Sequence, residues 1–460
     1  MNILFSTSAA PALSPFSTDE KRPPLGIGYL MSVVRTIGHT VFFVDNYLQP
    51  TNFIQEGYLQ KNSIDFVCIY ASTICYNETL KMLTAIEEVR KEGLWNGKVV
   101  VGGPHTSVAP NTVPEYVDFI VQGEGERAIL AIIAGQAKSR IVRCERVRDL
   151  DSLPFPAWDV FAPLSYDYSC PWMDEIPVFT MNTSRGCPHN CSFCSVDSVW
   201  GQQYTSYGAT RIVDEIEYLM QDFGAKGVYF REDNFTLNIK RTFDFCQELI
   251  NREISIAWAC ETRVDTLCNE KLVRQMSEAG CKAVYLGVES GSQRILDFLN
   301  KKITTAQVRE AVRLCKKHGI RTYCSLIVGV PTETYDDYLL TKKLMEELKP
   351  FDYTFNVFVG IPDSELYKYV IENDLYEHVD DLGLAYLPGF DVKAKYFYGL
   401  DSRLLVDYEF RERTDFDNAL LSELNKKRAG SRLFKTSVIN SALHFPDRFV
   451  ALVRNRLKHN

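Results

Sequence analysis

The stretch TSRGCPHNCSFC, residues 183–194, places three closely spaced cysteines in one segment, while the rest of the chain's 13 cysteines are scattered. Cys187, Cys191 and Cys194 have the spacing C-x3-C-x2-C, which allows one loop to point three sulfurs at a common centre. Thiolates in such a loop bind zinc or an iron–sulfur cluster. The segment therefore predicts a metal site, and the surrounding sequence predicts the fold that holds it.

A structural zinc site needs a fourth protein ligand. His189 lies between the cysteines, where it is poorly placed to turn inward with them, and no further C-x2-C or H-x3-H pair occurs. A four-iron cluster with one iron left open by the protein fits three thiolates better, and an open iron is a place for substrate. Zinc and a purely structural group of thiols remain the alternatives.

The cysteines belong to a region in which apolar strands alternate with amphipathic helices, such as residues 209–224 and 305–319. Six strand–helix units are too few for a complete eight-stranded barrel, so we expect a partial (β/α)6 barrel of the TIM type. Active sites gather at the carboxyl ends of such strands, and the cysteine loop follows the first strand at that end. The expected strands are residues 177–184, 226–233, 254–261, 281–290, 321–330 and 352–360.

The first part of the chain is a second α/β region, with helical patterns at residues 25–38 and 78–93. Its alternation predicts a parallel sheet in a flavodoxin-like (Rossmann-type) domain, which binds ligands beyond the carboxyl ends of its strands. Glycines 102, 103, 123 and 125 follow such ends, and the simplest interpretation of each is a tight turn. The five expected strands are residues 2–6, 40–45, 65–72, 98–103 and 119–123.

These patterns divide the chain into four parts: a domain at residues 1–148, a proline-containing linker at 149–172, the barrel at 173–375 and an extension at 376–460. The extension is expected to be mostly helical. Its last 35 residues hold nine Lys or Arg against one acid, and Pro446–Lys458 has apolar residues at helical spacing. This basic helix either packs on the barrel or makes peripheral contact with an anionic membrane surface or an acidic partner.

The overall composition excludes several classes of protein. A net charge of −8 argues against general nucleic-acid binding. We find neither a long apolar run nor a basic start before an apolar segment, so we expect no membrane span and no signal peptide. Free thiols inside apolar segments suit a cytoplasmic protein, with membrane association left open through the basic end.

The cysteine loop resembles the signature of the radical S-adenosylmethionine (SAM) superfamily, including the aromatic Phe193 before the last cysteine. The resemblance implies a [4Fe-4S] cluster on the three cysteines and SAM on the open iron, whose cleavage yields a 5′-deoxyadenosyl radical. It also implies SAM contacts at successive strand ends, although the usual GGE triplet is replaced here by residues 231–233. The implied SAM-binding residues are Phe193, Glu232, Asp233, Arg263, Glu289, Ser290 and Gly329.

The first domain, through residues 23–45, 101–107 and 121–128, is similar to the cobalamin-binding domain of the class B radical SAM family. The D-x-H-x-x-G motif that coordinates cobalt elsewhere is missing, so His105 is expected as a loop or tail contact rather than a cobalt ligand. The loop at 70–77 is the expected floor under the cobalt. The implied cobalamin contacts are Ser72, Thr73, Gly102, Gly103, His105, Gly123, Glu124 and Gly125.

The combined resemblance implies a methyltransferase that moves a methyl group from methylcobalamin to an unactivated carbon by way of the adenosyl radical. The alternative is a cobalamin-binding radical SAM oxidative cyclase or rearrangement enzyme. More remote alternatives are a methylthiotransferase acting on transfer RNA and a non-catalytic iron–sulfur protein. The implied partners are a small-molecule or lipid-like substrate and an external electron donor of the flavodoxin or ferredoxin type, and no residue is assigned to catalysis.

Overall fold

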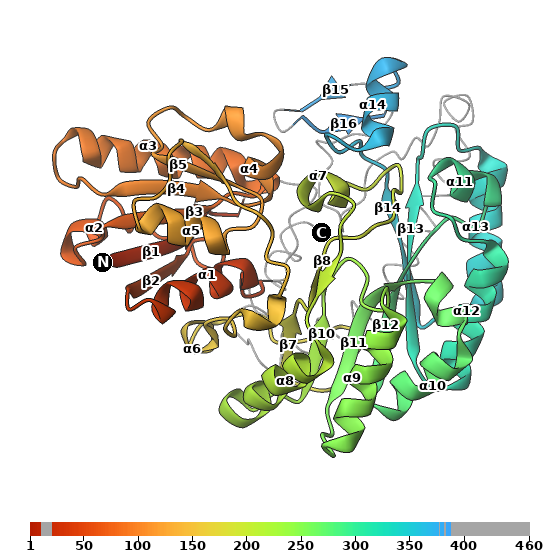
Figure 1. The fold of residues 1–460 in the computed structure, drawn as a ribbon. Coiled ribbons are helices and arrows are strands. Elements are labelled where there is room, and N and C mark those ends of the chain that lie inside the picture. The colour runs from red at the N-terminus through yellow and green to blue at the C-terminus, as the bar shows by residue number, and fades with distance from the viewer. Residues whose placement is uncertain (11–20, 377, 381–382, 388–460) are drawn as a thin grey trace, which may run out of the picture.

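A computed structural model describes residues 1–10, 21–376, 378–380 and 383–387 of the chain. Two parallel sheets dominate it and lie side by side (Figure 1). The expected (β/α)6 architecture of the barrel and the α/β architecture of the first domain are both confirmed. The expected mostly helical extension falls almost wholly outside the described residues, as does the basic segment Pro446–Lys458.

The first sheet has the strand order β2-β1-β3-β4-β5-β6, and every neighbouring pair is parallel. It holds six strands rather than the expected five, because the short β6 adds to the edge beyond β5 with one buried residue between two exposed ones. The strands are β1 (Asn2–Thr7), β2 (Thr40–Asp45), β3 (Phe66–Tyr70), β4 (Lys98–Gly102), β5 (Phe119–Gln122) and β6 (Ile141–Arg143).

Alternating side chains along these strands fill two different cores. Ile3 and Phe5 of β1 pack with helices α1 and α5, whereas Leu4 between them joins the core under helix α3 on the other face. This is why both faces of the sheet are covered. The helices are α1 (Leu25–Thr36), α2 (Tyr58–Lys61), α3 (Tyr76–Lys91), α4 (Pro104–Val108) and α5 (Glu126–Ile133), with 3₁₀ turns η1 (Thr73–Cys75) and η2 (Pro110–Thr112).

The second sheet has the order β14-β13-β12-β11-β10-β7 and is also parallel throughout. Its outward residues, such as Val284 and Leu286 of β12, pack under the surrounding helices. The inward Tyr285 stacks with Tyr323 and Trp172, which fill the barrel interior. The strands are β7 (Val178–Met181), β10 (Gly227–Phe230), β11 (Ala257–Arg263), β12 (Cys281–Glu289), β13 (Arg321–Val328) and β14 (Asp352–Val357).

Helices cover the outer face of the second sheet, and a two-stranded antiparallel ribbon of β8 (Ser184–Arg185) and β9 (Thr205–Ser206) brackets the cysteine loop. The helices are α7 (Val196–Trp200), α8 (Ala209–Phe223), α9 (Ile239–Asn251), α10 (Glu270–Glu278), α11 (Gln293–Phe298), α12 (Thr305–Lys317), α13 (Tyr335–Leu348) and α14 (Glu365–Glu372), with the 3₁₀ turn η4 (Asp265–Cys268). Beyond them, β15 (His378–Val379) pairs with β16 (Ala385–Tyr386).

The linker was expected to interrupt the strand–helix pattern. It contains regular structure, because it forms part of the core that the two domains share. It contains η3 (Leu150–Ser152) and α6 (Trp158–Phe161). The side chains of Trp158 and Phe161 are fully buried, and the indole of Trp158 donates to Glu215 Oε1 of α8 at 3.1 Å. One hydrophobic cluster therefore runs from the first sheet through the linker into the barrel.

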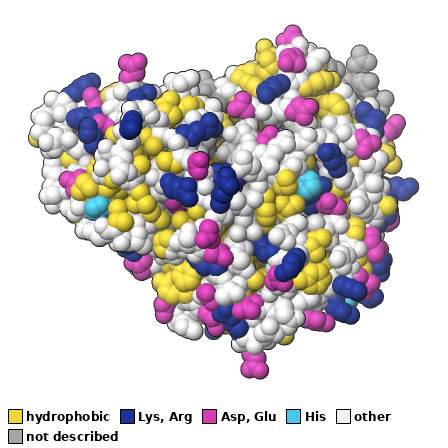
Figure 2. Space-filling view, in the orientation of Figure 1, with side chains coloured by type: hydrophobic (Ala, Val, Ile, Leu, Met, Phe, Trp, Pro, Cys, Tyr) yellow, Lys and Arg dark blue, Asp and Glu magenta, His cyan; other side chains and the backbone are white. Residues whose placement is uncertain are grey.

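None of the described helices combines the length and apolarity needed to cross a lipid bilayer. On the visible face of the described residues, Lys and Arg are interspersed with Asp and Glu, and no large area carries a single charge (Figure 2).

Candidate active site

The cysteine loop leaves the barrel at the carboxyl end of β7 and begins at a position that requires glycine. Gly186 has a φ of +82°, and a Cβ there would collide with the carbonyl oxygen of Gln203 across the base of the loop. Helix α7 closes the loop and contacts α4 of the first domain (Figure 1). The loop thus lies where the carboxyl ends of both sheets meet.

Each of the three sulfurs in this loop has an N–H donor. The backbone N–H of His189 faces the Cys187 thiol, and that of Val196 faces the Cys194 thiol. The third donor is Arg263 Nη1, which lies 3.7 Å from Cys191 Sγ.

Burial raises the pKa of the Cys187 thiol and raises that of Cys194 to about 11, and the two backbone donors oppose these shifts. Such donors stabilise the thiolate form that a metal ligand needs.

The donor set fits an iron–sulfur cluster better than a single ion. Among the described residues, no three His, Cys, Asp or Glu side chains converge closely enough to hold one metal ion. A cubane binds each thiolate at a different iron, so its three sulfurs stand further apart than the ligands of one zinc ion. The three cysteines are free and half-buried on one loop, which suits three thiolate ligands of such a cluster.

A buried ion pair that sequence reasoning missed stands beside the loop. Lys301 Nζ lies 2.6 Å from Glu289 Oε1, with both side chains less than a tenth exposed. Glu289 ends β12 at a φ of +65°, where the register of β12 on β13 shifts. Lys301 Nζ also lies 5.7 Å from the ring centre of Phe193. No motif marks Lys301, because only the packing of α11 on the strand ends places it here.

Arg263, at the end of β11, belongs to the same wall. Its Nη2 donates to the carbonyl oxygen of Lys301 at 2.7 Å and its Nε to Asp265 Oδ1 at 3.0 Å. With Nη1 directed at Cys191, the guanidinium faces the cysteine loop. Arg263 therefore contacts Cys191, and its expected contact with SAM stays a prediction.

The two acidic residues after β10 have different surroundings. Glu232 is buried, accepts hydrogen bonds from the backbone and hydroxyl of Thr183, and pairs with Arg241. The carboxylate thus anchors the start of the cysteine loop through Oε2, and its expected contact with SAM stays a prediction.

Asp233 accepts from the N–H of Gly186 and lies near Cys187. Partial loss of solvent and the neighbouring charge of Glu232 raise the pKa of Asp233 to about 6.

The remaining SAM candidates lie at the ends of β12 and β13. The Ser290 hydroxyl is fully buried, 3.1 Å from Thr341 Oγ1, and accepts from the Ser292 N–H, so it stabilises the start of α11. The N–H of Gly329 donates to Glu333 Oε2 at 2.7 Å. The Ser290 side chain thus helps to fix the start of α11, and its expected contact with SAM stays a prediction.

In the first domain, His105 is committed to the loop contacts that the sequence predicted. Its imidazole is buried and stacks on Tyr76 at a ring distance of 3.6 Å. Nδ1 lies 3.3 Å from the Thr73 hydroxyl and Nε2 lies 2.9 Å from the Thr112 hydroxyl. Burial lowers the pKa of His105 to about 4, so the ring is neutral. Both nitrogens are used, which agrees with its exclusion as a cobalt ligand.

The glycines of this edge allow close approach of neighbouring loops. Gly103 has a φ of +128°, and a Cβ there would stand 2.6 Å from the Ala71 carbonyl oxygen. Gly123 has a φ of +86°, and its N–H donates to Ser107 Oγ at 3.1 Å. The conformations at these two positions therefore serve turns that bring β3, β4 and β5 loops together.

Glu124 has a role that sequence reasoning did not anticipate. Its carboxylate is buried, accepts from the Val147 N–H at 2.6 Å, and pairs with Arg146 and with Arg185 of the ribbon strand β8. Its expected cobalamin contact stays a prediction, as do those of Gly102 at the end of β4 and Gly125 before α5.

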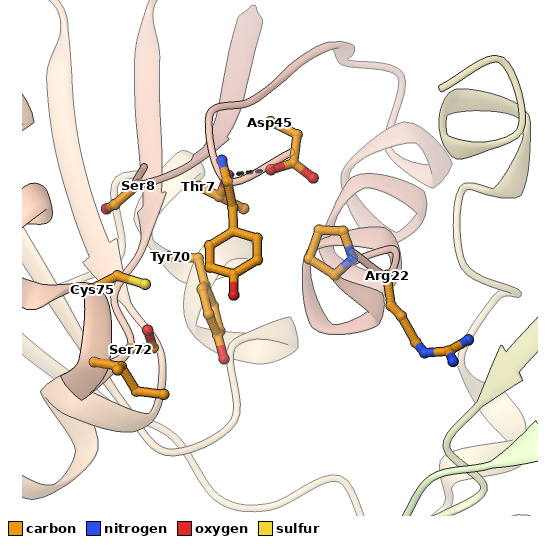
Figure 3. A pocket seen from close by; sticks show the side chains of 10 residues that line it. Thr7, Ser8, Arg22, Asp45, Tyr70, Ser72 and Cys75 are labelled. Carbon is orange, nitrogen blue, oxygen red and sulfur yellow. Dashed lines mark hydrogen bonds between the residues drawn. The ribbon is translucent and has the colours of Figure 1, made fainter. Parts of the chain in front are cut away.

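A pocket of about 220 Å³ opens at the carboxyl ends of β1, β2 and β3 (Figure 3). Tyr70, Ser72 and Cys75 line one side, from the loop that was expected to form the cobalt floor. Asp45 faces it from β2, accepting from the Thr7 hydroxyl at 2.5 Å. Arg22 extends from the pocket toward the barrel, where it donates to the Thr180 hydroxyl of β7 at 3.4 Å. All residues that line the pocket belong to the first domain, and Arg22 connects its rim to the barrel.

Comparison with known proteins finds two matching family models in this chain. Residues 17–133 match the model of the B12 binding domain, and residues 181–345 match that of the radical SAM superfamily. An uncharacterized methyltransferase of Pyrococcus horikoshii is 33% identical over 376 residues, which is 77% of this chain and 79% of that protein. The anaerobic magnesium-protoporphyrin IX monomethyl ester cyclase of Rubrivivax gelatinosus is 29% identical over 75% of this chain, which spans 66% of the cyclase.

Among solved structures, the radical SAM methyltransferase TsrM from Kitasatospora setae, with cobalamin and a [4Fe-4S] cluster bound, superimposes with a TM-score of 0.65. The match covers 85% of this chain and 76% of TsrM at 17% identity. The cobalamin-dependent radical enzyme OxsB, with aqua-cobalamin and SAM bound, gives a TM-score of 0.65 at 19% identity, over 81% of this chain and 55% of OxsB. At these identities the likeness concerns the fold.

Proposed function

Because this chain belongs to the radical SAM family whose members carry a B12-binding domain, we propose that it is a cobalamin-dependent methyltransferase acting on an unactivated carbon. One observation carries the proposal. The cysteine loop and the glycine-containing loops of the first sheet meet across the contact between α7 and α4, within one continuous core. Methyl transfer to a carbon radical needs both cofactors at one substrate, and this contact would bring the two cofactor regions close together.

Cys187, Cys191 and Cys194 would hold the [4Fe-4S] cluster, and Asp233, Gly329 and the backbones of Glu289 and Ser290 stand where SAM contacts are expected. When bound, the cluster and SAM supply one-electron radical chemistry and cobalamin supplies the methyl group. Three N–H donors of the chain face the cysteine sulfurs and would stabilise their thiolate form when they bind the cluster. The packed side chains of Phe193 and the core under α11 keep water from one side of the loop.

Cobalamin would lie over the carboxyl ends of β3, β4 and β5, with Ser72, Thr73, Gly102, Gly103, Gly123 and Gly125 as the proposed contacts. Since both ring nitrogens of His105 are hydrogen-bonded inside the protein, no imidazole from this loop would bind cobalt. The pocket at the ends of β1, β2 and β3 is too small to enclose a corrinoid, and we assign it to the substrate or to a side group of the corrinoid. The substrate proposed is a small or lipid-like molecule, and the electron donor is a flavodoxin or ferredoxin.

A second candidate function is an oxidative cyclase or rearrangement enzyme, favoured by the 29% identity to the anaerobic cyclase. The two functions differ in how they consume SAM. A methyltransferase of this class uses SAM both as methyl donor and as radical source, whereas a cyclase uses only the radical.

The test is anaerobic incubation of reconstituted protein with SAM, a low-potential reductant and cobalamin. S-adenosylhomocysteine and 5′-deoxyadenosine together support methyl transfer, and 5′-deoxyadenosine alone supports the second function. Cys191→Ala should abolish both products, whereas Cys144→Ala, a matched half-buried cysteine outside the loop, should keep them. Failure of the purified protein to take up iron or cobalamin would overturn the proposal.

A further inference from the structure

Four charged residues tie the edge of the first sheet to the base of the cysteine loop. Arg185, two positions before Cys187, places Nη1 3.3 Å from Glu124 Oε2 and Nη2 2.6 Å from Glu126 Oε1. Arg146 completes the set, with Nε 3.2 Å from Glu124 Oε1. The Glu124 side chain is 3% exposed, so these pairs are shielded from solvent. We call these four residues the interdomain clamp.

Arg146 also donates hydrogen bonds to uncharged partners on both sides of the loop base. Its Nη2 donates to the carbonyl oxygen of Arg185 in β8 at 3.2 Å and to the hydroxyl of Thr205 in β9 at 3.0 Å. Its Nη1 donates to the carbonyl oxygen of Trp200, the last residue of α7, at 3.3 Å. One guanidinium of the first domain therefore holds the two ribbon strands and the helix that enclose the three cysteines.

The other end of the clamp lies in the loop of the first sheet proposed to contact cobalamin. Glu124 stands between Gly123 and Gly125, directly after β5, and Glu126 begins α5. Glu124 Oε2 also fixes the backbone of Val147. Because Arg185 pairs with two carboxylates and Arg146 shares one of them, a shift of either loop would break several charge-assisted contacts in a buried place.

We propose that the interdomain clamp couples the two cofactor sites, so that ordering of the cysteine loop by its cluster tightens cobalamin binding through Glu124 and Arg185. These are positioning residues, and the inference rests on the proposed function. Coupling of this kind is reciprocal, since each ligand then changes the other's affinity by the same factor. It also gives the chain a way to complete the radical site and the methyl-donor site together.

The test measures hydroxocobalamin affinity of the full-length chain under anaerobic conditions, with the cluster reconstituted and in Cys191→Ala, which lacks it. The wild-type chain is expected to bind cobalamin about fivefold or more tightly with the cluster present. In Glu124→Gln the ratio of the two cobalamin affinities, with and without the cluster, should fall to about one. Arg35→Gln, which breaks the exposed ion pair from α1 to Asp159 of the linker, is the control and should keep the ratio.

Glu126→Gln removes only one partner of Arg185 and serves if Glu124→Gln folds poorly. It should lower the ratio while leaving the Arg146 contacts in place. Equal cobalamin affinities of the cluster-loaded wild type and Cys191→Ala would overturn the coupling, and so would an affinity ratio that both variants leave unchanged.

A cofactor-free measurement separates this inference from the proposed function. Amide hydrogen exchange of residues 186–204 in the apoprotein should be faster in Glu124→Gln than in Arg35→Gln. Equal exchange in the two variants refutes the clamp, whatever the chain binds. If instead the wild-type chain takes up neither iron nor cobalamin while exchange differs as expected, the proposed function fails and the clamp stands as a structural device only.

Discussion

The guanidinium of Arg263 lies with Nη1 3.7 Å from the sulfur of Cys191, although the two residues are 72 positions apart in the chain. Arg263 ends β11, and its other nitrogens bind Lys301 O and Asp265 Oδ1, so its orientation is set from three sides. A cationic N–H donor at a cluster thiolate stabilises the reduced, more negative state. Arg263 is therefore an electrostatic partner of the proposed cluster.

Arg263→Gln is expected to lower the reduction potential of the cluster and to slow 5′-deoxyadenosine formation about 10- to 100-fold. Potentiometric titration followed by electron paramagnetic resonance measures the first effect, and single-turnover product analysis measures the second. Arg252→Gln, which removes a guanidinium from ion pairs between α8 and α9 on the outer surface, is the control. An unchanged potential in Arg263→Gln would contradict the assignment.

Lys301→Met is expected to destabilise the apoprotein by about 3–5 kcal/mol, because it leaves the Glu289 carboxylate buried without its partner. Replacing both residues, as Lys301→Met with Glu289→Gln, should recover part of that loss, since no charge then remains buried. Urea unfolding of the three proteins checks this. A double variant no more stable than the single one would show that the charge is not the cause.

Gly186→Ala is expected to prevent most iron uptake, because the added Cβ meets the Gln203 carbonyl oxygen and the φ of +82° disfavours alanine. Gly201→Ala is a matched control in the same loop. Its φ of +63° carries the same kind of strain, about 1 kcal/mol, but nothing stands within 4 Å of the added Cβ. Iron and sulfide per chain after reconstitution measure the difference, and equal contents would refute the steric argument.

Glu333 predicts a pH dependence of stability. Burial raises the pKa of its carboxyl to about 8, although the backbone N–H groups of Gly329 and Val330 oppose the shift. The folded state therefore holds a proton that the unfolded state releases near pH 4.5. The stability this contributes is complete below that pH and is lost as the pH rises toward 8.

The free energy of unfolding should accordingly fall between pH 5 and 8 with a slope of up to about 1.4 kcal/mol per pH unit from this group. Glu333→Gln cannot titrate and should show a flatter profile over the same window. Urea unfolding of the apoprotein at pH 6 and pH 8 compares the two. Parallel profiles for wild type and Glu333→Gln would exclude Glu333 as the source.

Features carried by neighbouring residues were predictable from the sequence. The C-x3-C-x2-C spacing needs only one loop, and period-two strands alternating with helices indicate two parallel sheets because burial on both faces leaves that pattern. The strand ends near Arg263, Glu289 and Gly329 were placed correctly for the same reason. The edge strand β6 was missed, since three residues with one buried side chain carry too little pattern.

By itself, then, the sequence determined the two-sheet architecture and the family to which the chain belongs, and it predicted the cysteine site. Only the tertiary structure decided how individual charges are used: Glu232 turns to Thr183, Lys301 pairs with Glu289, and Glu124 reaches Arg185 across the domains. The physical reason is the distance along the chain over which each feature is determined. Motif spacing and hydrophobic periodicity are local properties of the sequence. A buried charge, in contrast, pairs with whichever group the packing of distant elements brings within a few ångströms.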